Sequence, residues 1–106
     1  MPGRSSGPGK GLVGIVLAEL HFPEGESLKT KRMSLGRMRD VLTRRYGATF
    51  AEVGYQDLWQ RSQVVFAVAA SNPQTLEETM DAAVRFLESQ DWELVLARQE
   101  VVEPDE

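Results

Sequence analysis

Hydrophobic and polar residues alternate near the end of the segment 12–22. Leu20 and Phe22 fall on one parity, and the polar Glu19 and His21 fall on the other. A period of two residues is typical of a strand that buries one face. The pattern therefore predicts a first strand over residues 12–22.

A helical period follows this strand. Ser27 is suited to the N-cap of a helix and Gly47 to the position just after its end. Between them the apolar residues recur at a spacing that places them on one stripe. They are Leu28, Leu35, Met38, Leu42 and Tyr46. We expect an amphipathic helix that ends at Tyr46.

The second half of the chain repeats this change of period. Residues 48–55 and 63–71 are rich in Val, Phe, Ala and Tyr and are separated by a polar loop, which is typical of a hairpin. Asn72 and Pro73 then form a helix start, and residues 92–102 alternate again. The apolar positions of the second helix are Leu76, Met80, Ala83 and Leu87.

The predicted order is strand, helix, strand, strand, helix, strand. With right-handed crossovers, this order gives an α+β ferredoxin-like βαββαβ sandwich, a four-stranded antiparallel sheet with both helices on one face. We expect a single domain over residues 11–102. Residues 1–10, rich in Gly, Pro and Ser, are expected to form a flexible tail, and residues 103–106 an acidic tail.

The face of the sheet that carries no helix is expected to be apolar as well. Val13, Ile15 and Leu17 share the parity of Glu19, and residues 64–70 are apolar on both parities. A face covered only by water alternates more clearly, so this face predicts a homodimer or a protein partner. The alternative is a central strand that tolerates exposed Val and Ile.

Composition excludes several kinds of chemistry. The chain has 106 residues, no cysteine and one histidine, so thiolate catalysis and Cys-ligated metal sites are excluded and a His-based metal site is not expected. No catalytic constellation is visible, and we expect no enzyme activity and no cofactor. The apolar run 12–18 is far too short to cross a membrane. Glu19 and His21 interrupt it and no cleavage site follows, so it does not read as a secretory signal, and we expect no membrane partner and a cytoplasmic location.

The distribution of charge suggests a partner. The net charge is −4, yet residues 27–46 hold seven basic residues and one acidic residue, so the predicted first helix carries +6. Such an asymmetry is expected of a surface that binds phosphate, which makes RNA the sharper hypothesis. The candidate RNA-binding residues are Lys29, Arg37 and Arg44 on the outer face of the helix, with Arg61 from the hairpin.

The alternative is a solvated helix surface with no partner. The predicted second helix holds four acidic residues against Arg85 and could neutralise the flank of the first. The sequence pI of about 5.0 is also unlike that of most RNA-binding domains.

A second group of residues is expected to have structural roles. Lys31 falls inside the apolar stripe of the first helix, and Arg32 and Arg39 flank it. Their stems can lie along the sheet while their charged ends reach a carboxylate, either Glu52 or Asp57.

Trp59, in the hairpin loop, is expected to pack over the end of the sheet or against a dimer partner. This interpretation is favoured over the alternative, in which its ring stacks on a base.

Three segments together resemble one family. They are residues 19–23 (ELHFP), 27–32 (SLKTKR) and 51–61 (AEVGYQDLWQR). In consistent order and spacing they resemble the YlxP-like proteins, small bacterial chains classed as a domain of unknown function. The chain departs from that pattern in its Gly/Pro/Ser leader and in a rather apolar first strand at Leu17.

The resemblance implies a ferredoxin-like fold and a gene that commonly sits among translation genes, beside those for initiation factor two and ribosome-binding factor A. It implies no established activity and no catalytic residues. Two functions remain open. One is an accessory factor that binds ribosomal RNA or a ribosomal subunit, and the other is a homodimeric interaction or small-ligand-sensing module that uses the open sheet face.

Overall fold

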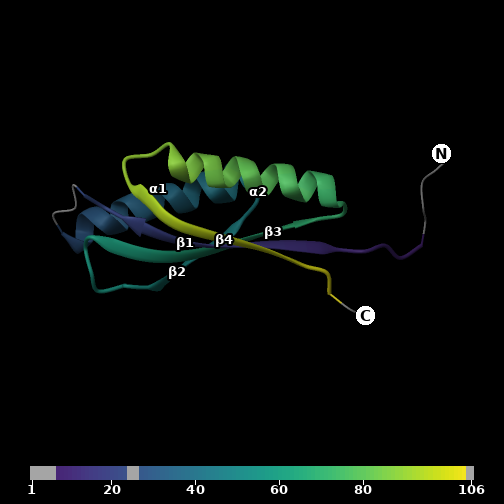
Figure 1. The fold of residues 1–106 in the computed structure, drawn as a ribbon, viewed down its shortest axis with the longest axis horizontal. Coiled ribbons are helices and arrows are strands. Elements are labelled where there is room, and N and C mark those ends of the chain that lie inside the picture. Colours follow the sequence, from purple (N-terminus) through teal and green to yellow (C-terminus); the bar gives the residue numbers. More distant parts are fainter. Residues whose placement is uncertain (1–6, 24–26, 105–106) are drawn as a thin grey trace.

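The computed structural model describes residues 7–23 and 27–104. Four strands and two helices follow one another in the predicted order, and Figure 1 shows both helices on one side of the sheet. The elements are β1 (Leu12–His21), α1 (Leu28–Tyr46), β2 (Thr49–Gly54), β3 (Arg61–Ala70), α2 (Pro73–Glu88) and β4 (Glu93–Val102).

The sheet has the strand order β2-β3-β1-β4, and each neighbouring pair is antiparallel. Helix α1 packs against β2, and α2 packs against β1, β3 and β4. This arrangement confirms the predicted α+β ferredoxin-like fold. The strands β2 and β4 therefore form the two edges of the sheet, and α1 lies over the β2 side.

The helix ends carry the predicted caps. Ser27 Oγ accepts a hydrogen bond from the backbone N–H of Thr30 at 3.1 Å, and Asn72 Oδ1 accepts one from Thr75 at 2.8 Å. Gly47 has a φ of 66°, a left-handed conformation that an L side chain rarely adopts. Local sequence signals thus define where α1 and α2 begin and where α1 ends.

The core lies between the helices and one face of the sheet. Gly14 lets α2 approach β1 closely, because a Cβ atom at this position would overlap Sδ of Met80. The buried apolar residues are Val16, Ala18, Leu20 and Phe22 of the first strand and its end, Leu35, Met38 and Leu42 of α1, Ala48, Val64, Phe66 and Val68, Leu76, Met80, Ala83 and Leu87 of α2, and Trp92.

The opposite face of the sheet carries no helix. Val13, Ile15 and Leu17 lie on it and are half-buried within the protomer. Their β3 partners are Ala69, Ala67 and Val65, so the centre of this open face is apolar, while its β4 margin carries Arg98 and Glu100 opposite Leu17 and Ile15.

Strand β3 begins at Arg61, two residues before the predicted start at Gln63. The pairing with β1 extends this far, because Ser62 pairs with Leu20 and Arg61 pairs with His21. The predicted tails fall partly outside the described residues, which omit 1–6 and 105–106. Where the two ends of the domain are described, Lys10 Nζ lies 3.1 Å from Glu103 Oε1. No helix in the described ranges is long and apolar enough to cross a membrane.

Candidate functional site

The exposed side of α1 carries six of the 12 lysines and arginines of the chain. Lys31, Leu35, Met38 and Leu42 are buried against the sheet, so residues about half a turn away around the helix point outward. The three bases of α1 that the sequence predicts to contact RNA are all exposed. They are Lys29, Arg37 and Arg44.

Lys29, Arg37 and Arg44 form no ion pair with a carboxylate of the described residues. The ion pairs formed among residues 7–23 and 27–104 involve four basic side chains, and Lys31 is the only one of them in α1. The acidic residues of α2 therefore do not pair with the basic residues of α1 within the described structure. The exposed side chains of α1 include six bases and one acid, Asp40.

Arg32 and Arg39, which flank Lys31 on α1, lie in different environments. The Arg39 guanidinium lies over the ring of Phe50, 5.3 Å from its centroid. Arg32 is exposed. Arg37 Nη2 donates a hydrogen bond of 3.4 Å to Ser34 Oγ on the same helix.

A shallow groove of about 600 Å³ runs between α1 and α2. Arg45 of α1 and Arg85 of α2 both line it, and none of the described acidic side chains does. The other lining residues are Val41, Tyr46, Ala82, Phe86, Ser89 and Gln90. At this groove α2 adds a base to the surface of α1. The sequence does not indicate that Arg45 and Arg85 lie close together, because their proximity depends on how the helices pack.

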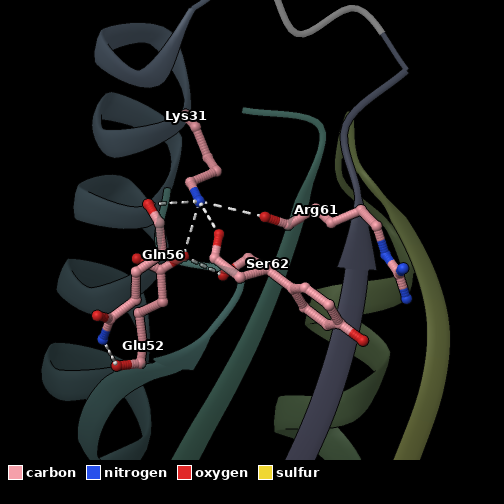
Figure 2. A network of polar contacts seen from close by, with 6 residues as sticks. Lys31, Glu52, Gln56, Arg61 and Ser62 are labelled. Carbon is pink, nitrogen blue, oxygen red and sulfur yellow. Dashed lines mark hydrogen bonds and ion pairs between the residues drawn. The ribbon is translucent and has the colours of Figure 1, made fainter. Parts of the chain in front are cut away.

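Lys31 occupies the centre of a polar network at the base of the β2–β3 hairpin (Figure 2). Its side chain is buried and points from α1 toward the hairpin. Nζ lies 2.9 Å from Glu52 Oε2, so Glu52 is the carboxylate that meets Lys31, and Asp57 lies exposed in the loop.

The same ammonium group binds backbone carbonyls of the hairpin loop. Nζ donates to the carbonyl oxygens of Tyr55 at 2.9 Å, Arg61 at 3.1 Å and Gln56 at 3.4 Å. A buried charge is tolerated only when it is paired and hydrogen-bonded. One lysine thus attaches α1 to both ends of the loop that joins β2 to β3.

Glu52 is held from two sides. Its Oε2 atom accepts a hydrogen bond of 2.7 Å from the buried Ser62 Oγ, and its backbone carbonyl accepts one of 3.0 Å from Gln56 Nε2. Because Oε2 also pairs with Lys31 Nζ, the carboxylate has two polar partners, Ser62 and Lys31, besides solvent. The network is therefore satisfied, as a buried polar cluster must be.

Tyr55 stands in a strained conformation within this loop. Its φ of 57° is uncommon for a residue other than glycine. The Arg61 guanidinium covers the Tyr55 ring at 4.2 Å from the centroid and lies 3.3 Å from Glu19 Oε1. Arg61, a candidate RNA contact from the sequence, is thus engaged with two neighbours of its own chain.

The loop exposes large apolar side chains at its tip. Trp59 is 42% exposed, and Leu58 beside it is 47% exposed. The tryptophan that packs in the core is Trp92, which is 6% exposed, donates from Nε1 to the Leu87 carbonyl at 3.0 Å and contacts the ring of Phe22. Much of the Trp59 indole remains open to solvent or to a partner.

His21 has a simple structural contact. Its Nδ1 atom lies 2.8 Å from Glu93 Oε1 across the β1–β4 ladder, and both side chains are exposed. Among the residues that the structure covers, no three side chains of the His, Cys, Asp or Glu type gather closely enough to hold a metal ion.

The sequence profile of the family described as "Protein of unknown function (DUF503)" matches residues 13–100. The chain belongs to the DUF503 family. This DUF503 chain is also similar to the "Uncharacterized protein YlxP" of Bacillus subtilis (strain 168), with 28% identity over 78 residues, which cover 74% of this chain and 85% of the relative. The matched region includes α1, the hairpin and the Lys31 network. The family resemblance stated from the sequence is therefore confirmed.

Proposed function

We propose that this protein is a non-enzymatic cytoplasmic factor that binds structured RNA through the exposed basic face of α1, with ribosomal RNA or a ribosomal subunit as the partner. Phosphate groups supply the charge that this face recognises. The proposal agrees with the translation-gene setting that the family resemblance implies.

One observation carries this proposal. The exposed bases of α1 form no ion pair with a carboxylate in the described structure, although the chain as a whole is acidic. The single base of α1 that is paired, Lys31, is the buried one.

The groove between the helices supports the same function. Arg45 and Arg85 approach it from two different elements, so the positive potential extends from α1 toward α2. A backbone phosphate or the shallow groove of an RNA helix meets positive charge from both sides here. Recognition of this kind reads the shape and the backbone of a duplex, not the base sequence.

The sheet itself offers no platform for stacking bases. Phe66 is buried in the core and Phe50 packs against it, so both lie on the side of the sheet that the helices cover. Single-stranded RNA bound on an open sheet requires exposed aromatic rings on that sheet. This favours a structured RNA bound through its backbone.

The second candidate is a homodimeric interaction or small-ligand-sensing module that uses the open sheet face. Its supporting observation is the row formed by Val13, Ile15 and Leu17 on the face without helices. Salt separates the two functions, because phosphate binding weakens steeply with ionic strength while apolar association persists or strengthens.

The test is a titration of fluorescently labelled ribosomal RNA fragments at several salt concentrations. We expect the triple variant Lys29→Gln, Arg37→Gln, Arg44→Gln to lower the affinity and to reduce the slope of log K against log salt by about 3. The matched control makes the same change in net charge elsewhere through Ser71→Glu, Thr75→Glu and Lys10→Gln, three exposed positions outside α1.

The control is expected to bind with nearly the wild-type slope. Acidic residues near a helix N-terminus are favourable, so its folding is preserved. Equal slopes for the wild-type protein and the α1 triple variant would rule out direct phosphate contact by this face. Equal loss in both variants would show that only net charge matters, which also contradicts a site on α1.

A further inference from the structure

Strand β4 is an edge strand with unusual exposure. Large apolar side chains that are exposed gather in two places outside α1, the hairpin segment 53–59 and β4. The four on β4 are Val95 (62%), Leu96 (42%), Val101 (57%) and Val102 (37%). Soluble proteins usually blunt a long edge strand, because its outer row of N–H and C=O groups can pair with another strand.

The other edge of the sheet is protected in this way. Strand β2 has 6 residues, and its pairing with β3 shifts between Glu52 and Gly54. Strand β4 has 10 residues and keeps a regular pairing with β1 from Leu96 to Val102. Only β4 therefore offers a long, regular outer edge.

The side chains along this regular part of β4 are self-complementary. On the open face, the sequence runs apolar, basic, acidic, apolar, in the residues Leu96, Arg98, Glu100 and Val102. On the helix side, Ala97 and Val101 stand on either side of Gln99. If a second copy of this strand lies antiparallel to the first and is centred on Gln99, apolar residues face apolar residues and basic residues face acidic residues.

We propose that β4 is the dimerisation strand of this protein, and that a second copy adds its own β4 in antiparallel orientation about a twofold axis at Gln99. Arg98 then faces Glu100 of the partner subunit, and Leu96 faces Val102 of the partner subunit. A twofold interface requires a self-complementary surface, and the pattern of residues 96–102 meets that requirement on both faces.

The resulting dimer has one continuous sheet, in the order β2-β3-β1-β4 followed by the same strands in reverse. Helix α1 lies on the β2 side of each protomer, so dimerisation leaves its basic face uncovered. The inference does not depend on the proposed RNA binding. If both hold, the dimer carries two basic faces on one side and binds a long RNA with avidity.

The test uses sedimentation equilibrium of the full chain and a charge exchange. Arg98→Glu places two acidic residues against each other at two symmetric positions, and Glu100→Arg does the same with basic residues. We expect each single variant to raise the dimer dissociation constant about tenfold or more. The double variant Arg98→Glu, Glu100→Arg restores both pairs and is expected to dimerise nearly as well as the wild-type protein.

A mixture of the two single variants gives a second, independent readout. The Arg98→Glu protomer presents two acidic side chains at positions 98 and 100, and these face the two arginines that the Glu100→Arg protomer presents at the same positions. The mixture is therefore expected to form a heterodimer, although each variant alone dimerises poorly. A heterodimer forms only when both variants are folded, so this result distinguishes a lost contact from misfolding of one variant. A wild-type protein that stays monomeric up to about 500 µM, a concentration at which even weak dimers form, overturns the proposal.

Two further variants separate the edge from the open face. Val101→Asp lies on the helix side of the β4 edge and is expected to break the dimer. Leu17→Lys lies at the centre of the open face and is expected to leave it intact. The reverse outcome, loss of the dimer with Leu17→Lys alone, would assign the contact to the open sheet face and contradict pairing through β4.

Discussion

The Nζ atom of Lys31 lies 2.9 Å from the backbone carbonyl oxygen of Tyr55, in a chain where Tyr55 adopts a positive φ. The same carbonyl also accepts a hydrogen bond of 3.0 Å from the N–H of Leu58, which closes the turn. A left-handed residue other than glycine persists only where its surroundings hold it. The lysine of α1 thus fixes the conformation of a loop that is 24 residues away in sequence.

We predict that Lys31→Met destabilises the protein by about 3 kcal/mol. The variant removes the ammonium donor from three carbonyls and from the Glu52 carboxylate, which keeps only Ser62, and breaking a buried ion pair at one partner is strongly destabilising. Urea unfolding followed by circular dichroism measures the change. Lys29→Met, an exposed position on the same helix, is expected to change the free energy of unfolding by less than about 0.5 kcal/mol.

A double-mutant cycle sharpens this result. Glu52→Gln weakens the charge pair, and its effect in the Lys31→Met background is expected to be smaller than in the wild-type protein by about 1 kcal/mol or more. Strictly additive effects would mean that Lys31 stabilises the hairpin through its carbonyl contacts alone.

Alanine substitutions at two glycines, Gly36 within α1 and Gly47 at its end, are predicted to change stability in opposite directions. Gly36→Ala is expected to stabilise the protein by about 0.5 to 1 kcal/mol, because a Cβ atom there meets no other atom within 4 Å and alanine favours the helix. Gly47→Ala is expected to destabilise it by about 1 kcal/mol, because φ at Gly47 is 66°. Thermal unfolding midpoints measure both, and destabilisation by Gly36→Ala would contradict the open environment found around that residue.

The two tryptophans are predicted to differ in their effect on stability. Trp92→Ala removes a core side chain and a buried hydrogen bond and is expected to destabilise the protein by about 3 kcal/mol or more. Trp59→Ala is expected to have less than about 1 kcal/mol of effect, because its ring is 42% exposed. Denaturant unfolding of both variants at one temperature gives the comparison, and equal losses would show that Trp59 is an anchor of the protomer.

Substitutions of Arg61 and Arg37 distinguish a structural role from a role in RNA binding. We expect Arg37→Gln to reduce the salt slope of RNA binding by about 1 and to leave stability unchanged. Arg61→Gln is expected to change the slope less, because its guanidinium already contacts Tyr55 and Glu19, and to destabilise the hairpin by about 0.5 to 1 kcal/mol. Salt titrations and unfolding of both variants provide the test; a larger slope change in Arg61→Gln would move the RNA contact to the hairpin.

Much of the fold follows from local patterns in the sequence. The alternation around Leu20 and the helical spacing of Leu35, Met38 and Leu42 indicate elements that the structure contains, because each pattern has the period of its own backbone. The caps at Ser27 and Asn72 place the helix starts within one residue, since a short polar side chain must accept the free N–H groups there.

The candidate site follows from the sequence only in part. The position of Lys31 inside an apolar stripe indicates that its charged end needs a partner, and Glu52 provides one. The three carbonyls around Nζ depend on the loop conformation, including the positive φ of Tyr55, and no residue pattern specifies that conformation. The groove between Arg45 and Arg85 depends on the distance between helices in the same way.

Sedimentation of the tagged protein through sucrose gradients of cell lysate tests RNA and ribosome binding most directly. Gradients at low and at physiological salt are compared for the wild-type protein and for the variant Lys29→Gln, Arg37→Gln, Arg44→Gln. We predict that the wild-type protein migrates with a ribosomal subunit or its precursors and that the variant stays at the top. Recovery of the wild-type protein only at the top of both gradients would contradict the proposed function and leave the basic face of α1 as a solvated surface.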